Sequence, residues 1–353
     1  DHAAWRERRE IAVGWADALE SAAATHGLDV ALYWYRNARS NNADLPDGAW
    51  RHLGGAPPEA AEDLSGVSAA PLEPILEAHA LILAPTEFSA TAPLKMLSRK
   101  LGFRAATMPG FGPAMIPALR LDYTELGRRV RFLKAILDIA VRADLVFEVD
   151  GSRTTSLRLD LRHRTAHASG GLFPDPGTAG NLPSGESYIV PYEGEVPGEP
   201  SQSAGELPVQ LGDEVVVYRV EKNRAVEVLS DGPASSREAE LLAREPAYGN
   251  IAELGLGVLG DFGIEPIGEV LLDEKLGLHI AFGRSEHFGG QVGPAQFSRP
   301  EAVVHQDRVY VPAIQPRVVA ARVDLQRGDG LKLALMRDGR YVIDWNTFED
   351  PEG

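Results

Sequence analysis

The chain has 353 residues, a formal net charge of −16 and no cysteine. Without cysteine, disulfides, thiolate zinc sites, iron–sulfur clusters and cysteine nucleophiles are excluded, so any metal must be held by oxygen and imidazole ligands. The acidic balance argues against nucleic acid or an anionic membrane as the main partner. No apolar stretch predicts a membrane span, and we therefore expect a cytoplasmic protein.

The N-terminal part alternates between predicted helices and strands. Apolar residues near helical spacing predict a helix from Trp5 to His26, which Gly27 ends before the extended run 28–35. The same alternation returns further on, with helices at 71–78 and 92–101 and buried strands at 81–84 and 103–108. Alternation of this kind predicts an α/β domain with a parallel sheet.

The pattern of predicted elements changes near residue 146. A long amphipathic pattern predicts a helix over 123–143, with an inner stripe of Leu126, Val130, Leu133, Ile136 and Ile139. The segments 146–150 and 156–161 then predict paired strands around a Gly-Ser turn, and several short strands follow. We therefore predict a parallel-sheet α/β domain over 1–146 and a strand-rich α+β domain over 147–353 that carries a metal site.

Histidines and acids gather in the C-terminal half. His279, His287 and His305 fall within 27 residues, among the acidic positions Asp273, Glu274, Glu286 and Asp307. His305 and Asp307 are two residues apart, so in a strand their side chains point to the same face and can converge on one ion. Imidazole with carboxylate suits zinc, manganese, cobalt or iron(II). The alternative is that these are surface groups that happen to be close in sequence.

Several segments, in this order, resemble the aminopeptidase T family. They cover about half of the chain, from roughly residue 145 to 310, and together they are far more specific than any one of them. The segments are Asn181-Leu182-Pro183-Ser184-Gly185-Glu186 with Val190-Pro191, then Asn250-Ile251-Ala252-Glu253-Leu254-Gly255-Leu256-Gly257, Asp273-Glu274-Lys275, His279-Ile280-Ala281-Phe282-Gly283 and His305-Gln306-Asp307.

The resemblance implies a dinuclear metallo-aminopeptidase that acts on a small molecule or short peptide and forms a homodimer. One or two divalent ions (zinc, cobalt or manganese) would be bound by Glu186, Glu253, Glu274, His279, His305 and Asp307. Glu186 or Glu253 would be the catalytic carboxylate that bridges the metals or takes the proton of the attacking water. The sequence leaves open which of the two does which.

The chain departs from the family at one point. The aminopeptidases carry a Tyr shortly after the strand histidine, whereas the segment here, 284–290, has none. Arg284 or His287 could replace it, or His287 could support a ligand through a hydrogen bond. We expect His163 and His167, beside a small basic patch, to lie outside the site.

Two other functions stay open. The chain is also similar to the ring-opening 2,5-dihydroxypyridine 5,6-dioxygenase of the shorter branch of this superfamily. That resemblance implies one iron(II) ion held by His279, His305 and Asp307. Two histidines and a carboxylate leave open positions for dioxygen and a bidentate substrate. A third possibility, prompted by the missing Tyr, is a member of the fold that binds a ligand without turnover.

Overall fold

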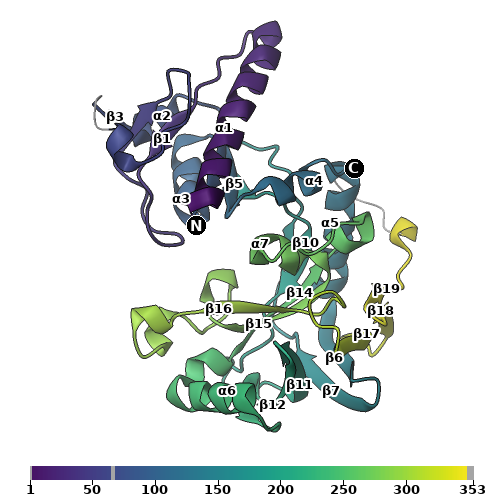
Figure 1. Cartoon of the computed structure of the whole chain (residues 1–353). Helices are drawn as coiled ribbons and strands as arrows, with labels where there is room; N and C mark the ends of the chain where they lie inside the picture. The colour runs from purple at the N-terminus through teal and green to yellow at the C-terminus, as the bar shows by residue number, and fades with distance from the viewer. Residues whose placement is uncertain (1, 65–67, 348–353) are drawn as a thin grey trace. The chain divides into compact units, whose positions relative to one another are not determined.

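The computed structural model describes residues 2–64 and 68–347. The chain divides into two compact units. Unit 1 comprises residues 1–121 and 171–184, and unit 2 comprises 122–170 and 185–353. The boundary predicted at residue 146 instead lies inside strand β6 (Ala140–Val149) of unit 2 (Figure 1). The reason is that β6 pairs along its length with β7 (Arg153–Asp160) and β17 (Val318–Arg327), so it cannot belong to another unit.

Unit 1 contains the predicted parallel sheet. Strands β4 (Leu81–Thr86) and β5 (Arg104–Pro109) pair in parallel, and β9 (Ala179–Asn181) adds to β5 after a long excursion of the chain. Their helices are α1 (His2–Ala23), α2 (Leu72–Glu77), α3 (Thr91–Leu101) and α4 (Ile116–Leu119). After α1, Gly27 adopts φ 65°, the left-handed conformation that ends the helical segment as predicted.

The extended run 28–35 does not join this parallel sheet. Only its end forms a strand, β1 (Tyr33–Tyr35), which pairs antiparallel with β2 (Gly48–Arg51). Strand β3 (Ala70–Pro71) completes a separate three-stranded sheet. The predicted alternation of helices and parallel strands therefore holds from residue 71 onward but not for the segment 28–35. Local periodicity does not show that this segment pairs antiparallel with a later strand.

Helix α5 (Tyr123–Asp138) opens unit 2 and is shorter than predicted. The side chain of Asp122 caps its first turn by accepting hydrogen bonds from the amides of Thr124 (2.9 Å) and Glu125 (3.3 Å). The helix ends before Ile139, which is 52% exposed although the periodicity places it on the inner stripe. The segment 140–149 is strand β6, because its apolar residues fit a period of two as well as a helical period.

Unit 2 contains an antiparallel sheet of eight strands. Its order is β13-β12-β11-β7-β6-β17-β18-β19, and β6 and β7 form the predicted hairpin. Asp150 and Gly151 have positive φ at the turn, as a tight hairpin requires. Helix α6 (Pro233–Arg244) packs against β12 and β13. The remaining strands of this sheet are β11 (Ala204–Leu211), β12 (Glu214–Glu221), β13 (Arg224–Val228), β18 (Lys332–Arg337) and β19 (Arg340–Tyr341).

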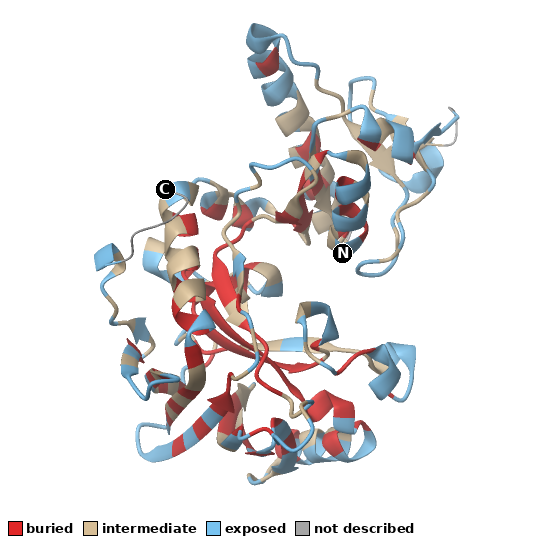
Figure 2. Ribbon diagram, turned by 180° about the vertical axis from the view of Figure 1, so that it is seen from behind, coloured by how far each residue is buried: buried red, intermediate tan, exposed pale blue. Residues whose placement is uncertain are grey.

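A second antiparallel sheet, of five strands, has two chemically different faces. Its order is β16-β15-β14-β10-β8, and its central strands are buried along their length (Figure 2). One face carries apolar side chains, such as Leu254, Ile280 and Phe282; Phe282 packs on Tyr218 of β12, with ring centroids 5.1 Å apart. The strands are β8 (His167–Ser169), β10 (Glu186–Ile189), β14 (Ile251–Gly257), β15 (Leu278–Gly283) and β16 (His305–Val309).

Short helical segments complete unit 2. Helix α7 (Val270–Asp273) leads directly into a 3-10 turn, η6 (Glu274–Leu276), just before β15. Within the described ranges, no helix combines the length and apolar composition that crossing a membrane requires.

Candidate metal centre

The second face of the five-stranded sheet carries small or metal-ligating residues. Along β14 it presents Glu253, Gly255 and Gly257, because alternate residues of a strand point to opposite faces. Antiparallel pairing places Gly255 opposite His279, Ala281 opposite Asp307 and Gly283 opposite His305. On the other side of β14, Glu186 pairs with Gly257. Strand register therefore gathers five of the six predicted ligands on one face.

Gly255 makes room for the imidazole of His279. A Cβ atom at position 255 would lie 1.8 Å from Nε2 of His279, so no other residue fits there without moving the ring. Gly257 makes room in the same way for the backbone of η6, since its Cβ would come within 2.2 Å of the carbonyl carbon of Lys275. The two glycines of the segment Glu253-Leu254-Gly255-Leu256-Gly257 thus let a ring and a turn lie directly on the strand.

The imidazoles of His279 and His305 are each held in place by a backbone carbonyl. Nδ1 of His279 is 3.2 Å from the carbonyl of Gly277, and Nδ1 of His305 is 2.7 Å from the carbonyl of Arg284. Bonds of this kind place the proton on Nδ1 and direct Nε2 toward the site. Both Nε2 atoms point at one carboxylate: Nε2 of His279 lies 3.2 Å from Oε1 of Glu253, and Nε2 of His305 lies 3.2 Å from its Oε2.

Glu253 belongs to two groups of potential metal donors. In the described part of the chain, each of two residue triplets has donor atoms within 4.8 Å of one another. We call Glu186, Glu253 and His279 the inner group, and Glu253, His305 and Asp307 the outer group. In the inner group, Nε2 of His279 is 3.5 Å from Oε2 of Glu186; in the outer group, Nε2 of His305 is 3.7 Å from Oδ1 of Asp307.

One buried atom shows that these residues fit a cation. Oε2 of Glu186 is buried and has no hydrogen-bond partner. A buried carboxylate oxygen without a hydrogen bond is costly, and a divalent cation is a natural partner for it when imidazole and other carboxylates stand nearby. The donor set therefore fits a metal site built from oxygen and nitrogen ligands.

The ionisation of the site is strongly perturbed. Burial alone would lower the pKa of His279 and of His305, but the hydrogen bonds and charge of Glu253 outweigh it and raise both pKa values to about 10. Burial opposes the ionisation of Glu253, yet hydrogen bonds from the same histidines hold its pKa well below the usual range. Burial raises the pKa values of Glu186 and Asp307. Such clustering of shifted groups is typical of a functional site.

Glu274 lies beside the two groups and is a member of neither. One of its carboxylate oxygens forms a short ion pair with Nζ of Lys275. Burial raises the pKa of Glu274 to about 7, although Lys275 acts in the opposite direction. The structure thus brings Glu274 next to the site through Lys275, and Glu274 contributes no donor atom to either triplet.

Lys275 is the main residue of this site that sequence reasoning missed. Its side chain is fully buried, and Nζ lies 3.2 Å from Oε1 of Glu186. Burial would lower the pKa of Lys275, but Glu186 and Glu274 outweigh it and raise that pKa. In the sequence, Lys275 directly follows the acidic residues Asp273 and Glu274. This position could have indicated that Lys275 lies near the site, but only the acidic residues of the segment suggest metal binding.

Arg284 and His287 are the predicted supporting residues. The guanidinium of Arg284 binds Glu286, with NH2 2.8 Å from Oε2, so only its backbone carbonyl supports His305. The ring of His287 lies edge-on to His305, with centroids 5.2 Å apart, and burial and the charge of His305 lower its pKa to about 4. His287 therefore packs beside His305 as a neutral imidazole.

Tyr188 lies on the site face because it is two residues after Glu186 in β10. His167 of β8 lies on the same face because it pairs with Tyr188. His167 nevertheless contributes no donor atom to either group. His163 does lie elsewhere, with Nε2 3.0 Å from Oε2 of Glu199. The missed signal at Tyr188 is its position two residues after Glu186, which places both side chains on one strand face.

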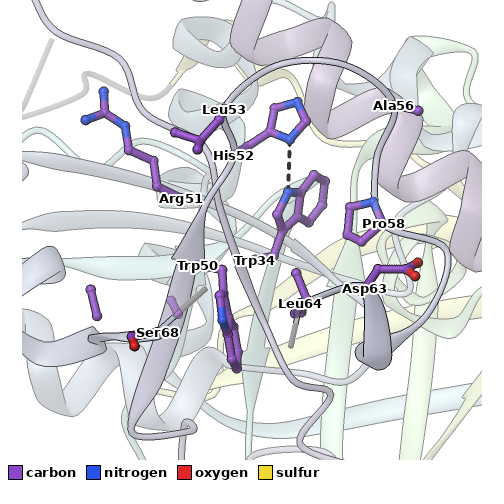
Figure 3. Close-up of a pocket in the computed structure, with 12 residues that line it drawn as sticks. Trp34, Trp50, Arg51, His52, Leu53, Ala56, Pro58, Asp63, Leu64 and Ser68 are labelled. Atoms are coloured by element: carbon purple, nitrogen blue, oxygen red, sulfur yellow. Dashed lines mark hydrogen bonds between the residues drawn. The ribbon is translucent and has the colours of Figure 1, made fainter. Parts of the chain in front are cut away.

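A separate cavity of about 420 Å³ lies in unit 1, beside β1 and β2 (Figure 3). Trp34 and Trp50 face it, and Nε1 of Trp34 donates a hydrogen bond to Nδ1 of His52 (3.2 Å). Its lining contains one carboxylate, that of Asp63, and one imidazole, that of His52. This composition resembles an apolar pocket more than a metal centre.

Comparison with known proteins shows the fold. No protein-family model and no curated protein matches the sequence. The structure is similar to that of 2,5-dihydroxypyridine dioxygenase from Pseudomonas putida KT2440, with a TM-score of 0.54 and 16% identity over 88% of this chain and 80% of that one. A partial likeness, with a TM-score of 0.42 and 22% identity, covers 63% of this chain and 55% of wild-type AmpT from Thermus thermophilus. The chain therefore shares the fold of the dioxygenase.

Proposed function

We propose that the protein is a metal-dependent hydrolase that directs an activated water at the amide or related carbonyl of a small substrate. The observation that supports this most strongly is the position of Glu253, whose two oxygens each lie 3.2 Å from a different histidine. A carboxylate shared between two donor groups is the arrangement that holds two ions side by side. In this proposal Glu253 is the bridging residue, which the sequence alone could not distinguish from Glu186.

Divalent ions, when bound, would activate a water and polarise the substrate carbonyl. Glu186 and His279 would bind at the inner group and His305 and Asp307 at the outer group, where their donor atoms already converge. The carbonyls of Gly277 and Arg284 keep the two imidazole rings in place through Nδ1. This support lets the donors hold their geometry without reorganisation.

The charge of the site also favours two ions. Four carboxylates (Glu186, Glu253, Glu274 and Asp307) surround one ammonium, that of Lys275, which leaves three uncompensated negative charges when the imidazoles are neutral. Two divalent cations and one hydroxide ion would balance this charge once the proton lost by the water has left the site for solvent, whereas one cation would leave the site negative. Buried charge without a partner is strongly unfavourable, so the balanced state is preferred.

Glu274 is the carboxylate best suited to accept a proton from the water. It is a member of neither donor triplet, and burial raises its pKa to about 7. A general base works best when its pKa is near the working pH. Lys275, which pairs with one oxygen of Glu274, would steady the group as it gains and loses the proton.

The test is metal content together with hydrolysis. The wild type, loaded with zinc, cobalt or manganese, is expected to hold two ions per chain and to hydrolyse amino-acid amides or dipeptides. His279→Ala and His305→Ala should each reduce the metal content to about one ion, because each removes a ligand from one group only. A single ion in the wild type, or no hydrolysis across these substrates in the two-metal protein, would contradict the proposal.

A second candidate is a mononuclear iron(II) dioxygenase. It is favoured by the presence of His279, His305 and Asp307 on one sheet face, and the shared fold makes this chemistry worth testing. The geometry favours it less, since Nε2 of His279 is closest to Glu253 and Glu186. One iron per chain, with oxygen uptake on a dihydroxylated aromatic ring after anaerobic iron loading, would establish it over the hydrolase.

A further inference from the structure

A set of aromatic rings adjoins the outer group. His287 and Phe288 approach the ring of His305 edge-on, with centroid distances of 5.2 and 5.4 Å. Phe288 packs on Tyr188 at 4.7 Å, and Tyr188 stacks on His167 at 5.1 Å. We call His167, Tyr188, His287 and Phe288 the aromatic cluster. It begins at an outer-group ligand and continues over β10 and β8.

The loop that carries half of this cluster is held firmly. Nε2 of His167 lies 3.0 Å from the carbonyl of Phe288, which ties the loop to β8. The buried carboxylate of Glu193 accepts hydrogen bonds from Oγ of Ser285 (2.6 Å) and from Nδ2 of Asn250 (2.7 Å). Gly290 packs on Ser285, because a Cβ there would lie 2.2 Å from its Oγ. The rings are therefore fixed before any ligand arrives, which lowers the entropic cost of binding.

The cluster is reachable from solvent and is uncharged in character. Tyr188 and Phe288 are half-buried, and His287 keeps exposed surface although its ring packs on Phe288 and His305, so part of the cluster remains accessible beside the outer group. The nearest cationic side chain on the loop, that of Arg284, is paired with Glu286 by two hydrogen bonds of 2.9 and 2.8 Å. Fixed rings on a loop whose one arginine is already paired suit a planar apolar group better than a carboxylate.

From this arrangement we propose that the aromatic cluster is the specificity subsite for an aromatic side chain next to the reacting carbonyl of the substrate. The inference rests on the proposed hydrolase function and names the substrate class for that site. Phe288 is its central residue, since it contacts Tyr188, His287 and His305. An aromatic side chain bound there would place its carbonyl beside the outer group.

The experiment compares an aromatic and a small substrate. For the metal-loaded wild type, kcat/KM is expected to be at least about tenfold higher for phenylalanine p-nitroanilide than for alanine p-nitroanilide. Phe288→Ala should reduce this ratio to below about threefold, and Phe288→Leu should give an intermediate ratio because it keeps apolar bulk without the ring. Val226→Ala, at a half-exposed position of β13, is the matched control and should keep the wild-type ratio.

A binding measurement separates this inference from the proposed reaction. Calorimetry of the metal-loaded protein should show phenylalanine hydroxamate binding about tenfold more tightly than alanine hydroxamate, with the preference lost in Phe288→Ala. If hydrolysis is absent but this binding preference is found, the aromatic subsite is supported and the proposed hydrolase function is rejected. If hydrolysis occurs with no aromatic preference, or if Phe288→Ala keeps the preference, the subsite is overturned.

Discussion

The inner and outer donor groups share Glu253 but differ in how far water reaches them. In the inner group the side chains of His279 and Glu186 are 1% and 9% exposed, and Lys275 lies against Glu186 with its side chain fully buried. In the outer group His305 is 19% exposed and stands at the edge of the aromatic cluster. The inner group is thus buried beside the charge of Lys275, whereas the outer group is partly exposed to solvent.

Two donor groups on one sheet face can therefore serve different purposes. A buried group with a fixed counter-charge is suited to retain its ion, because leaving would expose uncompensated carboxylates to a low-dielectric interior. A partly exposed group beside fixed rings is suited to exchange ligands and contact the substrate. We therefore expect the inner ion to dissociate more slowly than the outer one.

The largest effect is expected from removing the residue that the two groups share. Glu253→Gln keeps the size of the side chain but removes the charge between His279 and His305. Loss of a supporting residue alone usually lowers metal affinity or activity about 10- to 100-fold, so loss of this ligand should lower activity by more than about 100-fold. Elemental analysis should show both ions reduced. Glu265→Gln, at an exposed position, is the control, and a Glu253→Gln protein that keeps two ions would contradict the shared role.

A smaller effect, confined to the inner group, is expected from Gly255→Ala. The added Cβ would lie 1.8 Å from Nε2 of His279, so the imidazole must move away from Glu253. Activity should fall by about 10- to 100-fold, with the outer ion retained better than the inner one. Gly14→Ala is the matched control: nothing lies within 4 Å of its Cβ, so metal content should not change and stability should rise by up to about 1 kcal/mol. Equal loss of both ions in Gly255→Ala would argue against separable groups.

Lys275→Met tests whether the ammonium balances the inner group. Without it, the buried carboxylates of Glu186 and Glu274 both lose the ammonium that pairs with them, which should destabilise the protein treated with EDTA by about 3 to 5 kcal/mol. Chemical denaturation gives the free energy of unfolding with and without zinc. Bound zinc should restore part of the loss, because it supplies positive charge at the same carboxylates. A Lys275→Met protein as stable as the wild type without metal would show that Lys275 plays no such part.

A further prediction concerns the pH dependence of stability. In the EDTA-treated protein the pKa values of His279 and His305 are raised to about 10, so their contribution to stability is full below about pH 6.5 and is lost as pH rises through 10. The raised pKa of Glu274, about 7, acts in the same direction. Metal binding displaces these protons, so the stabilisation by zinc should grow from about pH 6 to about pH 9. Thermal unfolding with EDTA or zinc at several pH values measures this difference, and a constant difference would contradict the assigned ionisation.

Much of the site could be predicted because strand geometry is local. His305 and Asp307 share a face through the two-residue period of a strand, and the alternation of small residues and ligands in β14 and β15 follows from the amino-acid sequence alone. The C-terminal boundary of α5 and the limits of the units were less accessible, because 136–145 satisfies a helical and a strand period at once.

The amino-acid composition and local patterns already limit the chemistry that this protein can perform. It has no thiolate, it concentrates imidazoles and carboxylates in one stretch, and its periodicities specify a parallel sheet followed by a strand-rich region. Which residues meet depends on long-range pairing, because Glu186 and Glu253 come together through the register of β10 and β14, which no local pattern fixes. The tertiary structure likewise buried Lys275 between two acids and placed Tyr188 and His167 beside the ligands, since contacts of that kind depend on the pairing of distant segments.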